Sequence, residues 1–473
     1  MSVTNQVLKR IDATFEAAQQ RWIDWLRIPS ISAQPQHAGD CRAAAEYACK
    51  ELAALGFDAA VRETAGHPVV TAHHRGPASS PPGGKVPHLL YYGHYDVQPA
   101  DPLDLWTSPP FEPTIVDGPH GKRVYARGAV DDKGQVQMWL SAFRAWFEET
   151  GTMPCRISVL IEGEEETGSV NFKPFVEENR DEFNKADIIV ISDTGMWDAD
   201  TPALATSLRG MVYMDVILKA ASRDLHSGMY GGSALNPINA LTHALGQLKN
   251  TEGRVMVPGY YDGVRDISTR QSNQWSALGF SEEKFLGDIG LTEQYGEKGR
   301  GALERLWARP TCDICGIWGG YSGPGTKTVI ASEAGAKVSF RLVPGQDPAA
   351  VIEGFKAFMQ ARVPKDAKLV FTVHGQGQGL EIPVDSPFVQ AAASVLEEEY
   401  GKAAVMIGCG GSIPVVETFQ QALGLDSLLM GFGLDDDQVH SPNEKFEVKC
   451  FRHGLRSHAR LLGKLGAAPA AVR

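Results

Sequence analysis

Hydrophobic and polar positions in the first part of the chain follow helical and strand patterns in turn. Apolar residues recur at helical spacing in residues 1–32, 41–55 and 135–149. Three short apolar runs that end in polar residues predict strands at 88–92, 157–161 and 188–191. Strands that alternate with helices indicate an α/β fold, in which a mostly parallel central sheet carries helices on both faces.

The pattern changes after residue 208. The next elements are predicted in the order strand, helix, strand, strand, helix, strand, at residues 211–218, 236–248, 314–318, 336–343, 347–361 and 369–374. This order is that of a ferredoxin-like α+β unit. Helix 386–400, strand 427–431 and helix 449–465 then resume the first pattern. We therefore predict a discontinuous α/β domain, residues 1–208 and 381–473, with an inserted ferredoxin-like domain at 209–380.

Composition excludes several classes of protein. Of the 473 residues, 43% are hydrophobic and 22% charged, unlike a disordered, collagen-like or coiled-coil chain. Lys and Arg number 45 against 57 Asp and Glu, and this net charge of -12 disfavours nucleic acid and anionic membranes as partners. Residues 1–32 lack a signal peptide's apolar run, and seven cysteines, an odd number, do not suggest a disulfide framework. We expect a cytoplasmic protein with reduced thiols.

Residues capable of metal binding or acid–base chemistry follow the predicted strands or precede a helix. They are His94 and Asp96 after the first strand, Glu164, Glu165 and Glu166 after the second, Asp193 after the third, Asp131 and Asp132 before helix 135–149, and His440 after 427–431. Each has an ordinary explanation alone: a surface hydrogen bond for a histidine near an aspartate, a helix N-cap for Asp131 or Asp132, and a solvated face for adjacent acidic residues.

Together these residues are expected to meet at one edge of the sheet, because the carboxyl ends of parallel strands lie there and open α/β sheets bind ligands there. Two histidines and three or four carboxylates suit two divalent cations, zinc or manganese. Three ligand carboxylates and one hydroxide would balance the cations' charge. A two-metal phosphoesterase should show additional cationic or glycine-rich phosphate contacts, and none stands out. The sequence therefore predicts a two-metal hydrolase.

Several motifs, in order along nearly the whole chain, resemble the di-metal metallopeptidase family of carnosinases, cytosolic non-specific dipeptidases, aminoacylase and succinyl-diaminopimelate desuccinylase. They lie at residues 94–97, 127–134, 164–168, 193, 224–228, 340–345 and 440–444. Residues 165–169 and 412–414 resemble the carnosinase-like dipeptidase branch most closely. The resemblance implies that the inserted domain acts as a lid and dimerisation domain.

The resemblance also implies a role for each candidate ligand. His94 and Asp193 would bind one metal, Glu166 and His440 the other, and Asp131 would bridge both. The choice of Asp131 over its neighbour Asp132 rests on alignment to the family motif. The peptide bond between these two aspartates would be cis.

The remaining functional residues are likewise implied by the resemblance. Glu165 would be the general base, and Asp96 would orient the imidazole of His94. His226, in the inserted domain, would stabilise the oxyanion, often in the neighbouring subunit's site, which implies a homodimer. The substrate's carboxylate would bind Arg341, Gly411 and Ser412.

These roles predict hydrolysis of small peptides that carry a free C-terminal carboxylate, most simply by a dipeptidase. An N-acyl amino acid deacylase or a carboxypeptidase of the same family would share every metal ligand. A non-catalytic homologue should have lost a ligand or the base, yet all six positions are filled.

Overall fold

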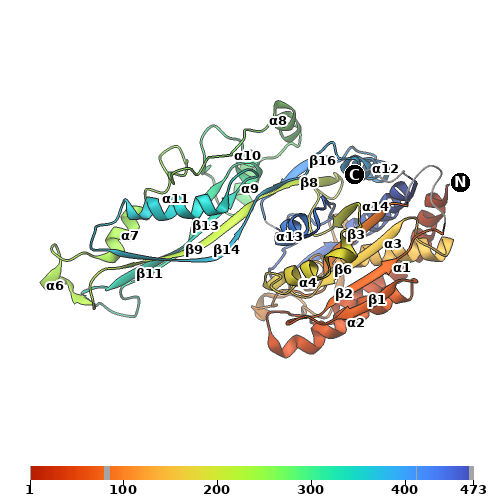
Figure 1. Cartoon of the computed structure of the whole chain (residues 1–473), viewed down its shortest axis with the longest axis horizontal. Coiled ribbons are helices and arrows are strands. Elements are labelled where there is room, and N and C mark those ends of the chain that lie inside the picture. The colour runs from red at the N-terminus through yellow and green to blue at the C-terminus, as the bar shows by residue number, and fades with distance from the viewer. Residues whose placement is uncertain (1, 79–85, 412, 468–473) are drawn as a thin grey trace. The chain divides into compact units, whose positions relative to one another are not determined.

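The computed structural model describes residues 2–78, 86–411 and 413–467 (Figure 1). The chain divides into two compact units. The first comprises Met1–Thr206, Ile382–Ile407 and Pro414–Arg473, and the second comprises Ser207–Glu381 and Gly408–Ile413. The short segment Gly408–Ile413, which the predicted boundaries place in the larger domain, thus groups with the second unit.

The first unit is built on a mixed sheet whose central strands are parallel. Its order is β1 (Asp58–Arg62), β2 (Val69–His74), β6 (Arg156–Glu162), β3 (His88–His94), β7 (Ile188–Ile191), β17 (Ser427–Leu429) and β8 (Ala203–Leu208), and β16 (Val405–Cys409) also pairs with β8. The two residues of β15 (Leu380–Glu381), which belong to the second unit, pair with Ser207 and Leu208 at the end of β8. Strands β6, β3, β7 and β17 run parallel, whereas β1, β2 and β8 pair antiparallel at the two sides. The predicted α/β fold with a mostly parallel centre is confirmed.

Helices cover both faces of this sheet, as predicted. They are α1 (Val3–Leu26), α2 (Ala38–Ala53), α3 (Lys133–Thr150), α4 (Phe172–Glu178), α5 (Arg180–Phe183), α12 (Pro387–Tyr400), α13 (Pro414–Leu423) and α14 (Val448–Ala467). Tyr91 and Tyr92 are successive residues of β3, so their side chains point to opposite faces of the sheet, and each contacts helices on its own face. The ring of Tyr91 lies 4.9 Å from that of Trp139 in α3. The ring of Tyr92 lies 5.4 Å from those of Phe172 in α4 and Phe419 in α13.

Smaller elements complete the first unit. A three-stranded antiparallel sheet has the order β18 (Lys445–Glu447), β5 (Gly121–Tyr125) and β4 (Thr114–Gly118). Three 3-10 turns are η1 (Pro35–His37), η2 (Leu103–Leu105) and η3 (Glu165–Thr167). The pairing of β18 with β5 joins the C-terminal part of the chain to the segment that precedes α3.

The second unit contains the predicted ferredoxin-like arrangement. Its antiparallel sheet has the order β11 (Thr311–Gly319), β13 (Glu333–Leu342), β9 (Gly210–Lys219) and β14 (Lys368–Gly377). Helices α7 (Pro237–Leu245) and α11 (Pro348–Gln360) pack against one face, where Val212, Met214 and Phe340 are buried with them. The remaining elements are β10 (Leu225–His226), β12 (Val329–Ile330), α6 (Ser227–Tyr230), α8 (Thr269–Ser276), α9 (Glu282–Asp288) and α10 (Ala302–Trp307).

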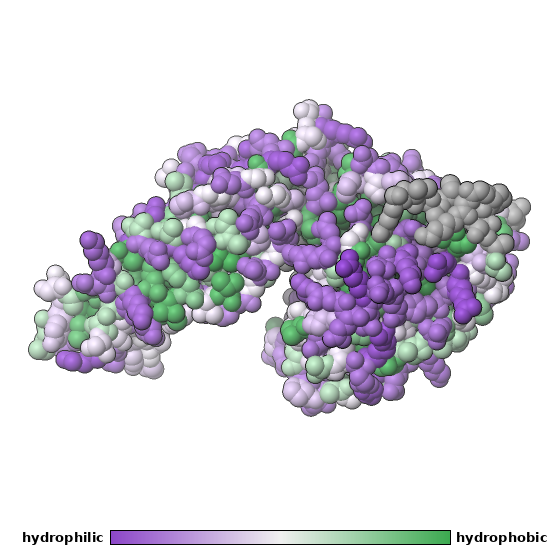
Figure 2. Space-filling view, viewed as in Figure 1, coloured by the Kyte–Doolittle hydropathy of each residue, from purple (hydrophilic) through white to green (hydrophobic). Residues whose placement is uncertain are grey.

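The surface of the second unit carries apolar side chains. Figure 2 shows hydrophobic residues in the region of α7 and β11. On β11, Ile314, Ile317 and Trp318 are 46%, 53% and 40% exposed. Within the described part of the chain, no helix combines the length and the apolar character that a membrane crossing requires.

Candidate active site

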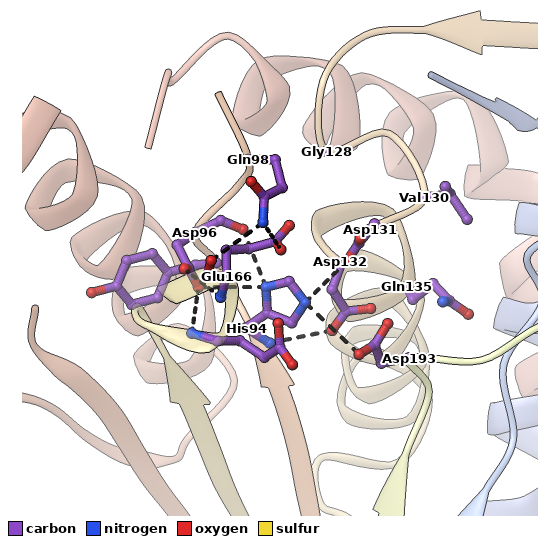
Figure 3. Close-up of polar contacts among 12 residues, drawn as sticks. His94, Asp96, Gln98, Gly128, Val130, Asp131, Asp132, Gln135, Glu166 and Asp193 are labelled. Atoms are coloured by element: carbon purple, nitrogen blue, oxygen red, sulfur yellow. Dashed lines mark hydrogen bonds and ion pairs between the residues drawn. The ribbon is translucent and has the colours of Figure 1, made fainter. Parts of the chain in front are cut away.

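The predicted metal ligands converge at the carboxyl-terminal edge of the parallel strands. His94 is the last residue of β3, and Asp193 lies two residues after β7. Asp131 lies two residues before α3, and Glu166 lies in the η3 turn after β6. His440 lies in the loop between β17 and β18 and has a positive φ of 61°. Figure 3 shows His94 pointing toward Asp131 and Asp193.

Two groups of ligand atoms share one carboxylate, that of Asp131. In each group, His94–Asp131–Asp193 and Asp131–Glu166–His440, the ligand atoms lie within 4.8 Å of one another. Nε2 of His94 lies 3.1 Å from Oδ1 of Asp131, and Nε2 of His440 lies 3.0 Å from Oδ2 of the same residue. His440 also lies 3.1 Å from Oε2 of Glu166. The two oxygens of Asp131 therefore face two different histidines.

Asp96 lies behind His94 and is completely buried. Its main-chain carbonyl lies 3.1 Å from Nδ1 of the imidazole, and its carboxylate oxygen Oδ1 lies 3.4 Å away. The Asp96 carboxylate also accepts hydrogen bonds from Oγ of Ser32 and from the backbone N–H groups of Glu165 and Glu166. One buried carboxylate thus fixes both the ring of His94 and the η3 turn.

The three adjacent glutamates have different environments. Glu164 turns away from the histidines, because its carboxylate accepts hydrogen bonds from the side chain and backbone of Asn171 and from the backbone of His67. Glu166 faces His440. Glu165 lies between them in sequence, and its backbone N–H donates to Asp96 at 3.3 Å. Three adjacent glutamates do not by themselves reveal separate roles, and before the structure only the family resemblance distinguishes Glu165 as the base from Glu166 as a ligand.

Two glutamines that sequence reasoning missed also support the ligands. Nε2 of Gln98 donates to Oε2 of Glu166 at 2.8 Å (Figure 3). Gln135 is buried, donates to the carbonyl of Thr194 and accepts from the backbone N–H of Phe432. It thereby holds the residue that follows Asp193. A lone glutamine gives no recognisable sequence pattern. Only the position of Gln98 shortly after β3, and that of Gln135 in the first turn of α3, could have suggested their roles.

The site concentrates negative charge in a poorly solvated place. Burial and the charge of Asp131 raise the pKa of Asp193 to about 7. Burial raises the pKa of Glu166, and it raises that of Glu165 well above the usual range. Hydrogen bonds to Asp131 and Glu166 raise the pKa of His440 to about 10. Neighbouring carboxylates with so little solvent are stabilised best by cations.

The donor set fits two divalent metal ions. Nε2 of His94 is buried and has no hydrogen-bond partner among the described residues, although it faces Asp131 and Asp193 at 3.1 and 4.0 Å. An imidazole nitrogen and carboxylate oxygens without sulfur ligands suit zinc or manganese. The side chain of His440 is 53% exposed, so solvent reaches this edge of the sheet. The Asp131–Asp132 peptide is cis, which confirms that prediction.

Comparison with known proteins identifies the family. The sequence profile of Peptidase family M20/M25/M40 matches residues 90–464, a range that contains both ligand groups. The chain belongs to this family. It is 31% identical to the Cys-Gly metallodipeptidase DUG1 of Candida albicans over 96% of both proteins. It is 33% identical to the human Beta-Ala-His dipeptidase over 80% of this chain and 75% of that protein.

A solved structure agrees with this assignment. The M20 family metallo-carboxypeptidase Sso-CP2 from Sulfolobus solfataricus superimposes with a TM-score of 0.82 at 30% identity, and the match covers 95% of this chain and 99% of that one. The chain is therefore a metal-dependent peptidase, and its predicted resemblance to the dipeptidase branch is confirmed.

The residues expected to bind substrate in this M20 peptidase belong to the second unit. Arg341 lies on β13, where its neighbours Phe340 and Leu342 are buried in the core. His226 ends β10 and accepts a hydrogen bond from the backbone of Gly228 at 3.0 Å. The carbonyl of Gly411 accepts from the backbone N–H of Arg209. Ser412 lies outside the described residues.

Proposed function

We propose that the protein is a dipeptidase that uses two divalent cations, zinc or manganese. The observation that carries the proposal is the arrangement of two histidine–carboxylate groups around one shared aspartate, Asp131. The dipeptidase names of the relatives at 31% and 33% identity support this choice within the family.

The atoms that face each other support the ligand assignment that the family resemblance implies. His94 and Asp193 would hold one metal, Glu166 and His440 would hold the other, and Asp131 would bridge them. The closeness of the two Asp131 oxygens to two different histidines supports its role as the bridge. Its neighbour Asp132 instead accepts a hydrogen bond from the backbone N–H of His94 through Oδ2. Asp96 would hold the imidazole of His94 in place, as the partner of a ligand histidine commonly does.

Glu165 is the general base in this proposal. When bound, the two cations would polarise the scissile carbonyl and make hydroxide available at neutral pH. Glu165 would accept the proton of the attacking water and deliver it to the nitrogen of the leaving amine. Burial raises the pKa of its carboxyl group, which suits a residue that must take up a proton and later return it.

The substrate would be held through its free carboxylate. Arg341 can form two parallel hydrogen bonds to a carboxylate, which favours peptides with an unblocked C-terminus. Gly411 and Ser412 would add donors near the same group. His226 would donate a hydrogen bond to the developing oxyanion.

We also propose a homodimer in which His226 acts in the partner's site, and a cytoplasmic location. The exposed Ile314, Ile317 and Trp318 support an interface, because apolar side chains that gather on a surface mark contact sites. Seven cysteines, an odd number, suit a reducing compartment. Light scattering tests the dimer, and cell fractionation tests the location.

The decisive test of the reaction is release of amino acids from dipeptides, tripeptides and N-acyl amino acids. The protein is stripped with a chelator and assayed before and after reloading with zinc or manganese. Metal-restored cleavage confined to dipeptides is expected. Cleavage of N-acyl amino acids alone would assign a deacylase, removal of the last residue from longer peptides would assign a carboxypeptidase, and no cleavage would contradict the proposal.

A further inference from the structure

One buried carboxylate outside the two ligand groups, that of Glu444, binds the turn that carries Asp131. Its Oε2 accepts from Nη1 of Arg127 at 2.7 Å and from the backbone N–H of Gly128 at 3.0 Å. Its Oε1 accepts from the backbone N–H groups of Val130 at 3.0 Å and Asp131 at 3.2 Å. The turn thus wraps three of its peptide groups around a side chain that lies more than 300 residues later in the sequence.

Arg127 extends this connection to a third segment. Its side chain is 1% exposed, and Nη2 donates to the carbonyl of Pro99 at 3.2 Å. The guanidinium also lies 5.4 Å from the ring centroid of Trp106. Pro99 directly follows Gln98, which holds the carboxylate of Glu166.

The loop that contains His440 is fixed at the same place. The side chain of Asn443 accepts from Thr107 and donates to the carbonyl of Leu105. The carbonyl of Glu444 accepts from the backbone N–H of Ala126 at 3.1 Å. Only three residues separate Glu444 from His440, so a shift of Glu444 displaces the loop and the Asp131 turn together.

We infer that Glu444, with Arg127, is a positioning residue that holds Asp131 and His440 in the spacing that two metal ions require. The inference rests on the proposed function, in which Asp131 bridges the metals. An ordinary structural ion pair would stabilise the fold without affecting the site. Here the backbone N–H of Asp131 is itself a partner of the carboxylate, so loss of the interaction moves the bridging ligand. Mutation of such supporting partners commonly weakens metal affinity tenfold to a hundredfold.

The test compares Glu444→Gln with Glu399→Gln in the full-length protein. Glu399 is a matched control, because its carboxylate is also buried and also bonds an arginine, Nε of Arg456 at 2.6 Å, but it lies on α12. Metal content is measured at buffered free Mn²⁺ concentrations, and thermal unfolding of both metal-free variants is recorded. EPR of the Mn²⁺-saturated proteins reports the spin coupling between two neighbouring ions.

We expect Mn²⁺ to bind Glu444→Gln about tenfold to a hundredfold more weakly than the parent protein, with a changed or lost spin-coupled signal. Glu399→Gln should lose thermal stability and keep both the affinity and the signal. Equal metal affinity and an unchanged signal in folded Glu444→Gln would overturn the inference. If Glu444→Gln does not fold, Arg127→Lys decides by the same criteria, since lysine keeps the charge but loses the planar fork.

Asp131→Asn separates this inference from the proposed function. If Asp131→Asn loses metal while Glu444→Gln keeps it, the positioning role is wrong and the metal site stands. If Asp131→Asn binds two ions as tightly as the parent protein, the bridging assignment fails, and the inference fails with it.

Discussion

Replacement of Glu165 by glutamine should abolish most turnover without loss of metal or of the fold. The amide has the same shape as the carboxylate but accepts no proton from water. General base catalysis contributes about 10²- to 10⁴-fold to a rate, which corresponds to about 3 to 5 kcal/mol of activation free energy. We expect kcat to fall by that factor while KM changes little, because Glu165 contacts the reacting water in the proposal and not the substrate carboxylate.

The surroundings of Glu165 also predict the stability of this variant. Burial and the negative charges of Asp193, Asp131 and Glu166 raise the pKa of its carboxyl group. A carboxyl group whose pKa is higher in the folded than in the unfolded protein destabilises the fold at pH values above its unfolded pKa. Metal-free Glu165→Gln should therefore unfold at pH 7 at a temperature equal to or above that of the parent protein.

The assay combines steady-state kinetics on a dipeptide with metal analysis and thermal unfolding of the same preparations. Glu164→Gln is the matched control, since the Glu164 carboxylate already bonds Asn171 and the backbone of His67 and faces away from the ligand groups. Its kcat should remain within a few-fold of the parent value. Turnover by metal-loaded Glu165→Gln near the parent rate would refute the assignment of Glu165 as the base.

Three further predictions concern other parts of the molecule. His440→Ala should bind one metal ion per chain in place of two, as measured by elemental analysis, and retention of two would contradict its role as a ligand. Arg341→Met should lower kcat/KM for free dipeptides about tenfold to a hundredfold, mainly through a higher KM, and should affect C-terminally amidated analogues little. Equal losses of kcat/KM on both substrates would show that Arg341 does not bind the substrate's carboxylate. Burial opposes ionisation of Glu399, but hydrogen bonds from His453 and Arg456 outweigh it and lower its pKa from 4.5 to about 2. The Glu399 carboxylate therefore stabilises the fold by about 3 kcal/mol above pH 4.5 and loses that contribution as the pH falls toward 2. Denaturant unfolding of Glu399→Gln should show a lower free energy of unfolding at pH 7 than the parent protein, and that free energy should depend less on pH in the acid range.

The strands that lead to His94, Glu166 and Asp193 could be predicted because β3, β6 and β7 are short and almost fully buried. Strands β3 and β7 consist almost entirely of buried residues, so their apolar runs stand out from the surrounding sequence. The edge strand β1 was not predicted, because Asp58 and Arg62 at its ends are polar and its burial is incomplete. Strands β4 and β5 form a largely exposed hairpin and give no apolar run.

The supporting contacts of the site could not be predicted in the same way. A ligand at the end of a strand is placed by local sequence and by the parallel order of the sheet. The bonds between Glu444 and the Gly128–Asp131 turn depend on how two distant segments pack, and no local pattern encodes that. The different partners of Glu164 and Glu166 likewise depend on the η3 turn, although the family resemblance already implied separate roles for Glu165 and Glu166.

Anomalous diffraction can show whether Asp131 bridges two metal ions. Crystals of the protein loaded with zinc or manganese would be measured on both sides of the absorption edge of the metal. We expect two anomalous peaks, one beside His94 and Asp193 and one beside Glu166 and His440, with one oxygen of Asp131 against each. A single peak, or two peaks of which only one contacts Asp131, would contradict this bridging role.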